Sequence, residues 1–305
     1  MGTPVFAVAS LEILHKNGYE ICAVVTVPDK KKGRGLHLSF SDVKKYALEN
    51  NLYLLQPESL NDTSFEKEII SIRPDLIVVV AFRILPKRIF TIPKFGSINL
   101  HASLLPKYRG AAPINRAIMN GEKETGVTTF FLKEKVDTGN IILQKKINID
   151  DSDDAGSMHD KLSLLGAEVV LETVKLIGND EVDLKIQDEK LTTSAPKIFK
   201  EDCNINWNTT AAEVNNFIRG LSPYPCACTC LNGKTIKIYK ALIPSEVFST
   251  APGKIIILEK KLYAGTNDNV IEILELQLEG KKKISASEFI NSLNKSVEYQ
   301  FKKCD

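Results

Sequence analysis

The sequence contains no apolar run of membrane-spanning length, and it does not open with a basic segment followed by an apolar core and a cleavage site. It also carries little net charge, because 40 basic residues offset 38 acidic ones and leave +2. The chain is therefore not a polycation, and any contact with a nucleic acid must come from local basic patches. These absences predict a soluble, cytoplasmic protein that has no membrane partner.

Metal-binding motifs are missing as well. The four histidines have no HExxH or comparable spacing, and the six cysteines do not form two CxxC-like pairs. Cys226, Cys228 and Cys230 alternate, which would place all three on one face of a strand. We interpret them as ordinary reduced cysteines and expect no metal cofactor.

The length and the pattern of the first part indicate an α/β fold. A chain of 305 residues with 43% hydrophobic residues fits two globular domains. Alternating β-branched runs and helical patterns predict a doubly wound, mostly parallel, Rossmann-like sheet. The expected strands are 19–27, 52–55, 75–82 and 96–101, with two further β runs at 125–134 and 140–149. The expected helices are 6–18, 41–51, 62–73, 113–120 and 156–178.

The pattern changes after residue 182. Residues 183–206 are polar and irregular, and a short helix is expected at 210–221. Short β runs without long helices between them follow at 235–243, 253–265 and 269–280, which predicts a small C-terminal β-barrel of OB-like type. The expected domains are a catalytic domain at 1–182, a linker at 183–204 and the barrel at 205–305.

One stretch breaks the rule that a strand buried on both faces is apolar. In SINLH, Ser97, Asn99 and His101 alternate with Ile98 and Leu100, so the three polar side chains share one face of the strand. In an open parallel sheet, ligands bind beyond the carboxyl ends of the strands. Asn99 and His101 are therefore expected to face a crevice.

A carboxylate is expected beside this strand. The segment KVDTGN places Asp137 at a turn between two β runs that can fold back next to it. An amide, an imidazole and a carboxylate suit a reaction through an oxyanion, with Asp137 holding one nitrogen of His101 while the other nitrogen faces the substrate. No GxSxG elbow supplies a protein nucleophile, so the substrate would bring its own. On the residues alone, a purely structural His–Asp pair is an equal alternative.

The segment NLHASLLPKYRGAAPINRAIMNGEKETGVTTFFLKEKVDTGNI resembles the signature of the folate-dependent formyltransferases, in which an Asn-x-His pair, a Ser-Leu-Leu-Pro loop and a later Asp form the site. The resemblance implies that Asn99, His101 and Asp137 are catalytic. It also implies that the formyl donor, 10-formyltetrahydrofolate, binds against the loop formed by Ser103, Leu104, Leu105 and Pro106.

Within that family the chain resembles the members that act on an aminoacylated tRNA, through GTPVFAVASLEIL, PDKKKGRG, RGAAPI, DTG and the expected barrel. This resemblance implies transfer of the formyl group to the α-amino group of methionine on initiator tRNA, which prepares it for translation initiation. It also implies tRNA contacts from the basic loop and from a lysine run in the second domain: Lys32, Arg34, Lys281, Lys282 and Lys283. A monomer is expected.

Two other functions stay open beside this one. Formyltransferases that act on an amino sugar nucleotide resemble this layout, including its second domain, although they tend to lack the GTP start and the GRG loop. A tRNA- or folate-binding protein without catalysis is the third possibility, and it would be favoured by replacement of Asn99, His101 or Asp137, all of which are present.

Two local departures accompany the resemblance. The family usually reads Ala-Tyr-Gly-x-Ile-Leu-Pro where this chain has AFRILP at 81–86, so folate contacts from this loop are expected to differ. A doubly wound domain also normally begins with a strand, whereas MGTP at 1–4 is already a loop before a helix. We expect the first strand to be missing, with Met1 above an empty slot between the strands at 19–27 and 75–82.

Overall fold

The computed structural model describes residues 1–32, 37–294 and 297–304, and the chain divides into two compact units. The first unit comprises residues 1–110, 125–147 and 159–195. The second comprises residues 111–124, 148–158 and 196–305. Two short segments, 111–124 and 148–158, therefore cluster with the C-terminal residues.

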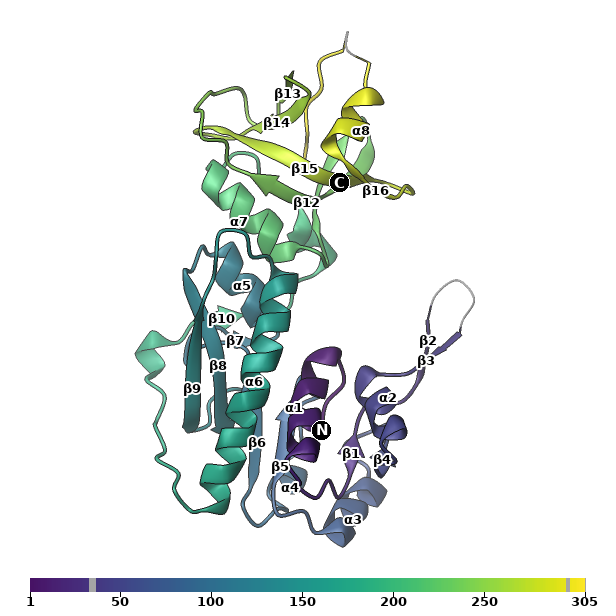
Figure 1. Ribbon diagram of the computed structural model, residues 1–305, viewed down its shortest axis with the longest axis vertical. Helices are drawn as coiled ribbons and strands as arrows, with labels where there is room; N and C mark the ends of the chain where they lie inside the picture. The colour runs from purple at the N-terminus through teal and green to yellow at the C-terminus, as the bar shows by residue number, and fades with distance from the viewer. Residues whose placement is uncertain (33–36, 295–296, 305) are drawn as a thin grey trace. The chain divides into compact units, whose positions relative to one another are not determined.

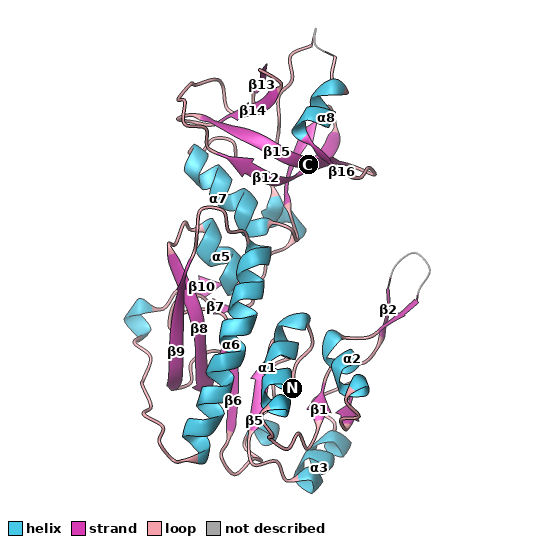
Figure 2. Cartoon of the chain, viewed as in Figure 1, coloured by secondary structure: helices cyan, strands magenta, loops and turns pink. Residues whose placement is uncertain are grey.

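A four-stranded sheet in the order β5-β6-β8-β9 forms the centre of the first unit (Figure 1; Figure 2). Its strands are β5 (Ile77–Val80), β6 (Ser97–His101), β8 (Glu124–Phe131) and β9 (Ile141–Asn148). β5 and β6 are parallel, whereas β6 and β8 are antiparallel. The sheet is therefore mixed, as the sheets of many doubly wound domains are.

Helices cover both faces of this sheet. α1 (Val5–Lys16) and α6 (Ala155–Gly178) are joined by a hydrogen bond from the Ser163 hydroxyl to the Phe6 carbonyl. Ile177 of α6 packs with Ile98 of β6 on one face, while α3 (Thr63–Ile72) and α4 (Lys87–Phe90) share a buried cluster with Ile77 and Val79 on the other. The two separate cores confirm the Rossmann-like architecture.

Local signals explain where some helices begin. α2 (Asp42–Glu49) starts after Ser41, whose hydroxyl accepts a hydrogen bond from the Lys44 N–H. α3 starts after Asp62, at the beginning of the expected helix 62–73, although the Asp62 side chain makes no capping bond. No helix of the described residues is long and apolar enough to cross a membrane.

A second, short parallel pair lies beyond β5. It consists of β1 (Val24–Val25) and β4 (Leu54–Leu55), and β1 is much shorter than the expected run at 19–27. β1 is paired with β4 and not with β5; between β1 and β5 lie Met1 and Gly2. The predicted slot is therefore present between these two strands.

Two smaller strand pairs complete the first unit. β2 (Lys30–Lys32) and β3 (His37–Ser39) form an antiparallel ribbon on either side of the residues that are not described. β7 (Arg109–Gly110) pairs in parallel with β10 (Ser194–Ala195). Residues 183–206, which were expected to be irregular, therefore contain the strand β10 and two 3-10 turns, at Glu189–Leu191 and Lys200–Cys203.

The second unit is an antiparallel sheet with the order β11-β12-β15-β14-β13, and β16 pairs with β15. Backbone hydrogen bonds join Lys302 to Cys230 at one edge of the sheet and Phe301 to Gly253 beside the other edge. The C-terminal segment thereby bonds to both edges of this antiparallel sheet, which is consistent with the predicted barrel. The elements of this unit are α5 (Pro113–Met119), α7 (Ala211–Leu221), β11 (Ala227–Leu231), β12 (Lys234–Leu242), β13 (Ile255–Leu258), β14 (Lys261–Gly265), β15 (Val270–Leu278), β16 (Lys283–Ser285) and α8 (Ala286–Asn291).

Two details of the barrel differ from the expectation. The single β run expected at 253–265 is a hairpin of β13 and β14 that turns at Glu259 and Lys260, both of which have left-handed backbone angles. Cys226 has a φ of 77° and precedes β11, so only Cys228 and Cys230 lie on that strand. The three cysteines therefore do not share one strand face.

Candidate active site

β6 presents its polar residues on one face. Ile98 and Leu100 point to the α6 side, where Ile98 packs with Ile177 and Leu100 lies against Gly166. Ser97, Asn99 and His101 consequently point to the opposite face, where the Ser97 hydroxyl donates to the Phe90 carbonyl. The predicted alternation is thus present.

The side chains of Asn99 and His101 have different surroundings. His101 is buried, with 7% of its surface exposed, whereas Asn99 is half-buried. Within the described part of the chain, no residue forms a hydrogen bond with the Asn99 side chain. Its two N–H donors are therefore available to a ligand.

Asp137 lies next to His101, as the sequence predicted. The distance from His101 Nδ1 to Asp137 Oδ2 is 3.9 Å, and Asp137 Oδ2 also accepts a hydrogen bond of 2.9 Å from the Gly110 N–H. Both side chains are buried, with 7% of each residue exposed. The histidine and the carboxylate therefore form a close pair away from bulk water.

The second nitrogen of His101 does not face the substrate side, contrary to the expectation from the sequence. Its Nε2 atom lies 2.8 Å from the carbonyl oxygen of Tyr108, because the loop after β6 turns back onto the ring. A carbonyl only accepts hydrogen bonds, so Nε2 must donate. In the neutral ring, Nδ1 then has a lone pair directed toward Asp137.

The turn that carries Asp137 is held by backbone constraints. Asp137 has a φ of 55°, and a Cβ atom on Gly139 would lie 1.6 Å from the Phe131 carbonyl oxygen, so only glycine fits there. The Nε2 atom of Gln187 donates to the carbonyls of Asp137 and Gly139, at 2.9 and 2.8 Å. Gln187 therefore fixes the position of Asp137.

Gln187 was not identified from the sequence. It is buried and lies in the stretch assigned to a linker, and its amide oxygen accepts hydrogen bonds from Nε and Nη2 of Arg109. Arg109 also pairs with Glu189, which holds the pKa of that carboxyl below its usual range. No local pattern marks Gln187, because its role depends on residues about 50 and 80 positions away.

The predicted folate loop is tied to β8 and β9. The Ser103 hydroxyl donates to the Lys107 carbonyl, and Thr128 Oγ1 donates to the Ser103 carbonyl and accepts from the Leu105 N–H. Leu105 packs with Phe130 and Ile141 in a buried cluster. Ser103 and Leu105 thus support the loop from within, while Leu104 and Pro106 are half-buried.

The shortened loop at 81–86 follows β5. Ala81 has a φ of 46°, and the guanidinium of Arg83 donates to the carbonyls of Pro57 and Glu58. The arginine that departs from the family pattern therefore braces a neighbouring loop through its Nη1 and Nη2 atoms.

The predicted tRNA-binding residues lie in both units. Lys32 ends β2, and Arg34 falls outside the described residues. Lys281, Lys282 and Lys283 are exposed in the second unit, and the Lys283 ammonium lies 2.6 Å from a carboxylate oxygen of Glu275. The charge of Lys283 is therefore partly neutralised within the chain.

Two cysteines of the second unit, Cys226 and Cys228, are buried and are protonated thiols at neutral pH. Burial raises the pKa of both the Cys226 and the Cys228 thiol to about 12. All six cysteines are free, and the described residues contain no group of three or more histidine, cysteine, aspartate or glutamate residues that could hold a metal ion.

Comparison with known protein families identifies the class to which this chain belongs. The sequence matches the formyl transferase family over residues 1–174 and the C-terminal domain of formyl transferases over residues 197–294. The chain thus contains both domains of a formyl transferase.

The relatives narrow this class. A methionyl-tRNA formyltransferase of Flavobacterium johnsoniae is 47% identical over 303 residues, which cover 98% of this chain and 96% of that protein. The enzyme of the same name from Caldanaerobacter subterraneus is 46% identical over 292 residues, covering 95% and 94%. The chain belongs to the family of methionyl-tRNA formyltransferases.

Solved structures share the fold at lower identity. The N-formyltransferase of Helicobacter canadensis, solved with folinic acid and dTDP-3-aminofucose, has a TM-score of 0.68 at 24% identity, covering 93% of this chain and 97% of that chain. HypX of Aquifex aeolicus, solved with tetrahydrofolic acid, has a TM-score of 0.61 at 20% identity, covering 83% of this chain and 44% of that chain.

Proposed function

We propose that this chain transfers the formyl group of 10-formyltetrahydrofolate to the α-amino group of methionyl-tRNA. The observation that carries the proposal is the near full-length identity with relatives named for this reaction, 47% over 98% of the chain in one case. The buried pair of His101 and Asp137 beside the free amide of Asn99 provides chemistry that suits it.

The His101–Asp137 pair is suited to bind an amine. His101 Nδ1 and Asp137 Oδ2 are two acceptors 3.9 Å apart, and neither can satisfy the other unless a proton lies between them. A protonated α-amine can donate one hydrogen bond to each acceptor. Since α-amino groups titrate near pH ~8, much of the substrate arrives protonated at neutral pH, and these acceptors can take up its proton.

The reaction then proceeds by addition and elimination. The neutral amine attacks the formyl carbon, a new C–N bond forms, and the carbonyl electrons move to the oxygen. The Asn99 amide donates a hydrogen bond to this oxyanion, and protonated His101 adds positive charge nearby. When the oxyanion collapses, the bond to N10 of the folate breaks and N10 takes the first proton from the His101–Asp137 pair. The second proton of the attacking nitrogen then passes to this pair and on to solvent, which leaves the neutral formamide.

Two binding assignments complete the proposal. The loop 103–106 contacts the folate through its backbone and through the half-buried Leu104 and Pro106, and its ties to Thr128 hold it in place. The unit that contains residues 205–305 binds the body of the tRNA, with Lys281 and Lys282 near its phosphates. The basic segment around Lys32 and Arg34 contacts the acceptor end.

The test presents the purified chain with 10-formyltetrahydrofolate and one of two acceptors, methionyl-tRNA or a dTDP-linked amino sugar. We expect formyl transfer to the methionyl-tRNA, detected as N-formylmethionine after deacylation, and no transfer to the sugar. Transfer to the sugar alone would assign the chain to the sugar formyltransferases. Binding of tRNA or folate without any transfer would leave it a binding protein.

A further inference from the structure

The strand β7, which pairs with β10 (Figure 1), is connected to both members of the His101–Asp137 pair. The carbonyl of Tyr108, the residue before β7, accepts from His101 Nε2 at 2.8 Å. The Gly110 N–H, at the end of β7, donates to Asp137 Oδ2 at 2.9 Å. The geometry of the pair therefore depends on what holds residues 108–110 in place.

Tyr108 has a backbone conformation that needs support. Its φ is 61°, in the left-handed region, which is unfavourable for a residue other than glycine. Such a conformation persists only where the surrounding structure fixes it. The two peptide groups on either side of the Tyr108 Cα atom set its φ and ψ, so their hydrogen bonds decide whether it is kept.

Thr193, the residue directly before β10, accepts a hydrogen bond from each of these two peptide groups. Its Oγ1 atom accepts from the Tyr108 N–H at 2.8 Å, and its carbonyl accepts from the Arg109 N–H at 2.9 Å. In a trans peptide the carbonyl points away from the N–H, so the Tyr108 carbonyl points away from Thr193 and toward His101. Thr193 therefore fixes the acceptor of the His101 Nε2 proton.

The position of the proton on His101 decides what this side chain can do. With the proton on Nε2, the Nδ1 lone pair is directed toward Asp137 and can accept the proton of a substrate amine. With the proton on Nδ1, the ring would donate toward the carboxylate and could no longer accept there. The Asp137 carboxylate by itself favours the proton on Nδ1, whereas the Tyr108 carbonyl favours it on Nε2.

We propose that Thr193 is a positioning residue, which keeps the proton of neutral His101 on Nε2 by holding the Tyr108 carbonyl in place. The effect on catalysis rests on the proposed function, but the position of the proton can be measured without any substrate. Thr193 lies in the stretch that was expected to be a linker, 183–204. This stretch would thus contribute to the chemistry through the loop after β6.

The test compares three variants of the full chain. Thr193→Val puts a methyl group in the place of the hydroxyl, so the Tyr108 N–H loses its acceptor and water cannot replace it. Thr193→Ser keeps the hydroxyl. Thr192→Val is the matched control, because the hydroxyl of this neighbouring residue is buried and has no hydrogen-bond partner among the residues that the structure describes.

Nitrogen NMR of the chain with labelled histidine locates the proton on His101, at a pH where the ring is neutral. The protonated and the unprotonated nitrogen of an imidazole are chemically distinct, and the His101 signals are identified by their absence from His101→Gln. We expect the form with the proton on Nε2 in the chain, in Thr193→Ser and in Thr192→Val. Thr193→Val should shift these signals toward the form with the proton on Nδ1.

Turnover gives the second readout. With 10-formyltetrahydrofolate and methionyl-tRNA, Thr193→Val should lower kcat by about tenfold with little change in KM, and Thr193→Ser should restore it. Unchanged signals and a normal kcat in Thr193→Val would overturn the proposal, and so would a change in only one of the two measurements. If the chain itself transfers no formyl group, the proposed function fails, and the spectra alone then decide whether Thr193 sets the position of the proton.

Discussion

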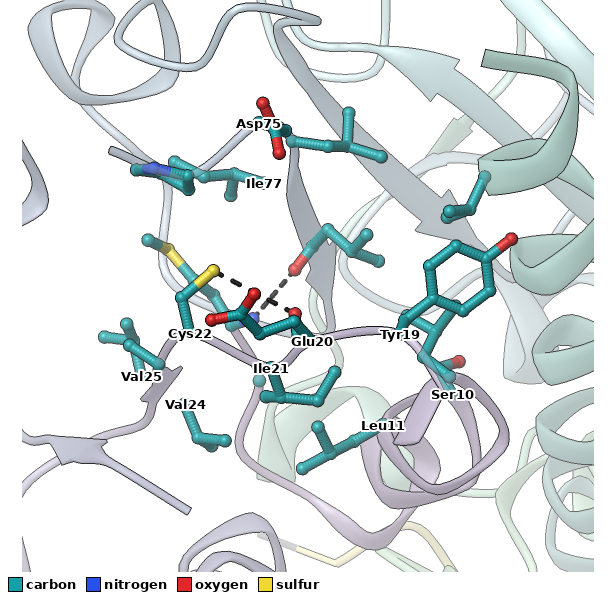
Figure 3. Close-up of a pocket in the computed structure, with 18 of the residues that line it drawn as sticks. Ser10, Leu11, Tyr19, Glu20, Ile21, Cys22, Val24, Val25, Asp75 and Ile77 are labelled. Atoms are coloured by element: carbon teal, nitrogen blue, oxygen red, sulfur yellow. Dashed lines mark hydrogen bonds between the residues drawn. The ribbon is translucent and has the colours of Figure 1, made fainter. Parts of the chain in front are cut away.

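The two edges of β5 differ sharply. At one edge, all four residues of β5 have partners in β6, from Ile77 opposite Ser97 to Val80 opposite Leu100. At the other edge, Met1 and Gly2 are the only described residues that lie alongside, and the rest of this edge faces a cavity (Figure 3). β6, which carries Asn99 and His101, is therefore paired on both sides, whereas the incomplete pairing lies at the far edge of its neighbour β5.

The difference shows which part of the domain tolerates a gap. Asn99 and His101 depend on β6, and Asp137 depends on a turn held by Gln187 and Gly139, none of which lines the slot. The gap should therefore affect the stability of the first unit more than the geometry of the site.

The largest effect is expected for the free energy of unfolding at low pH, through the Met1 amine at the incompletely paired edge of β5. The Met1 amine has a pKa of 8.0 when unfolded and about 5 when folded, so the unfolded chain binds more protons between these values. The free energy of unfolding should therefore fall as the pH falls from about 8 to about 5, by up to about 4 kcal/mol. Urea unfolding of the chain with a free and with an acetylated N-terminus measures this contribution as a difference. Parallel pH profiles for the two forms would contradict it.

On the firmly held side, Asn99→Ala should lower kcat by roughly 10²–10³-fold, because one donor to the oxyanion is lost. The dissociation constant for methionyl-tRNA should hardly change, since this hydrogen bond strengthens only in the transition state. Asn17→Ala removes an exposed asparagine amide that donates to the Ile13 carbonyl, and it serves as a control with normal turnover. Normal turnover of the Asn99 variant would remove this residue from the mechanism.

A smaller loss of turnover is expected for Gln187→Ala. The turn of Asp137 would lose two hydrogen bonds, and a shift well below 1 Å should lower kcat about tenfold with little change in KM. Gln300→Ala removes a glutamine of the second unit that likewise donates to a backbone carbonyl, that of Pro252, and it controls for general destabilisation. A change in KM alone would show that Gln187 does not act through Asp137.

The smallest effect concerns the salt dependence of tRNA binding. Replacing Lys281 and Lys282 together by glutamine should reduce the slope of log K against log salt by about 1–2, because fewer counterions are released. Lys283→Gln should change the slope less, since Glu275 already pairs with Lys283. If Lys283→Gln has the larger effect, or neither change alters the slope, these lysines do not bind phosphates.

The sequence predicted what depends on local patterns. The polar face of β6 follows from alternation, the start of α2 from Ser41, and the turn of Asp137 from its place between two β runs. The empty slot followed from the rule that a doubly wound sheet begins with a strand.

Other features depend on partners that are distant in sequence. Gln187 bonds to the Asp137 carbonyl and His101 bonds to the Tyr108 carbonyl. Every residue has a backbone carbonyl, so these partners cannot be recognised from residue type. The turn between β13 and β14 uses Glu259 and Lys260 in left-handed conformations. Such turns usually contain Asn-Gly, which is absent here, so the sequence analysis predicted one β run at 253–265 in place of a hairpin.

The central claim is that Asp137 and His101 together accept the proton of the attacking amine. Single-turnover formylation of methionyl-tRNA by the chain and by Asp137→Asn tests it most directly, since asparagine keeps the shape and can still accept from the Gly110 N–H but has no charge. The account predicts that the Asn variant binds methionyl-tRNA normally and transfers the formyl group about 10²-fold more slowly or worse. An unchanged single-turnover rate would contradict it.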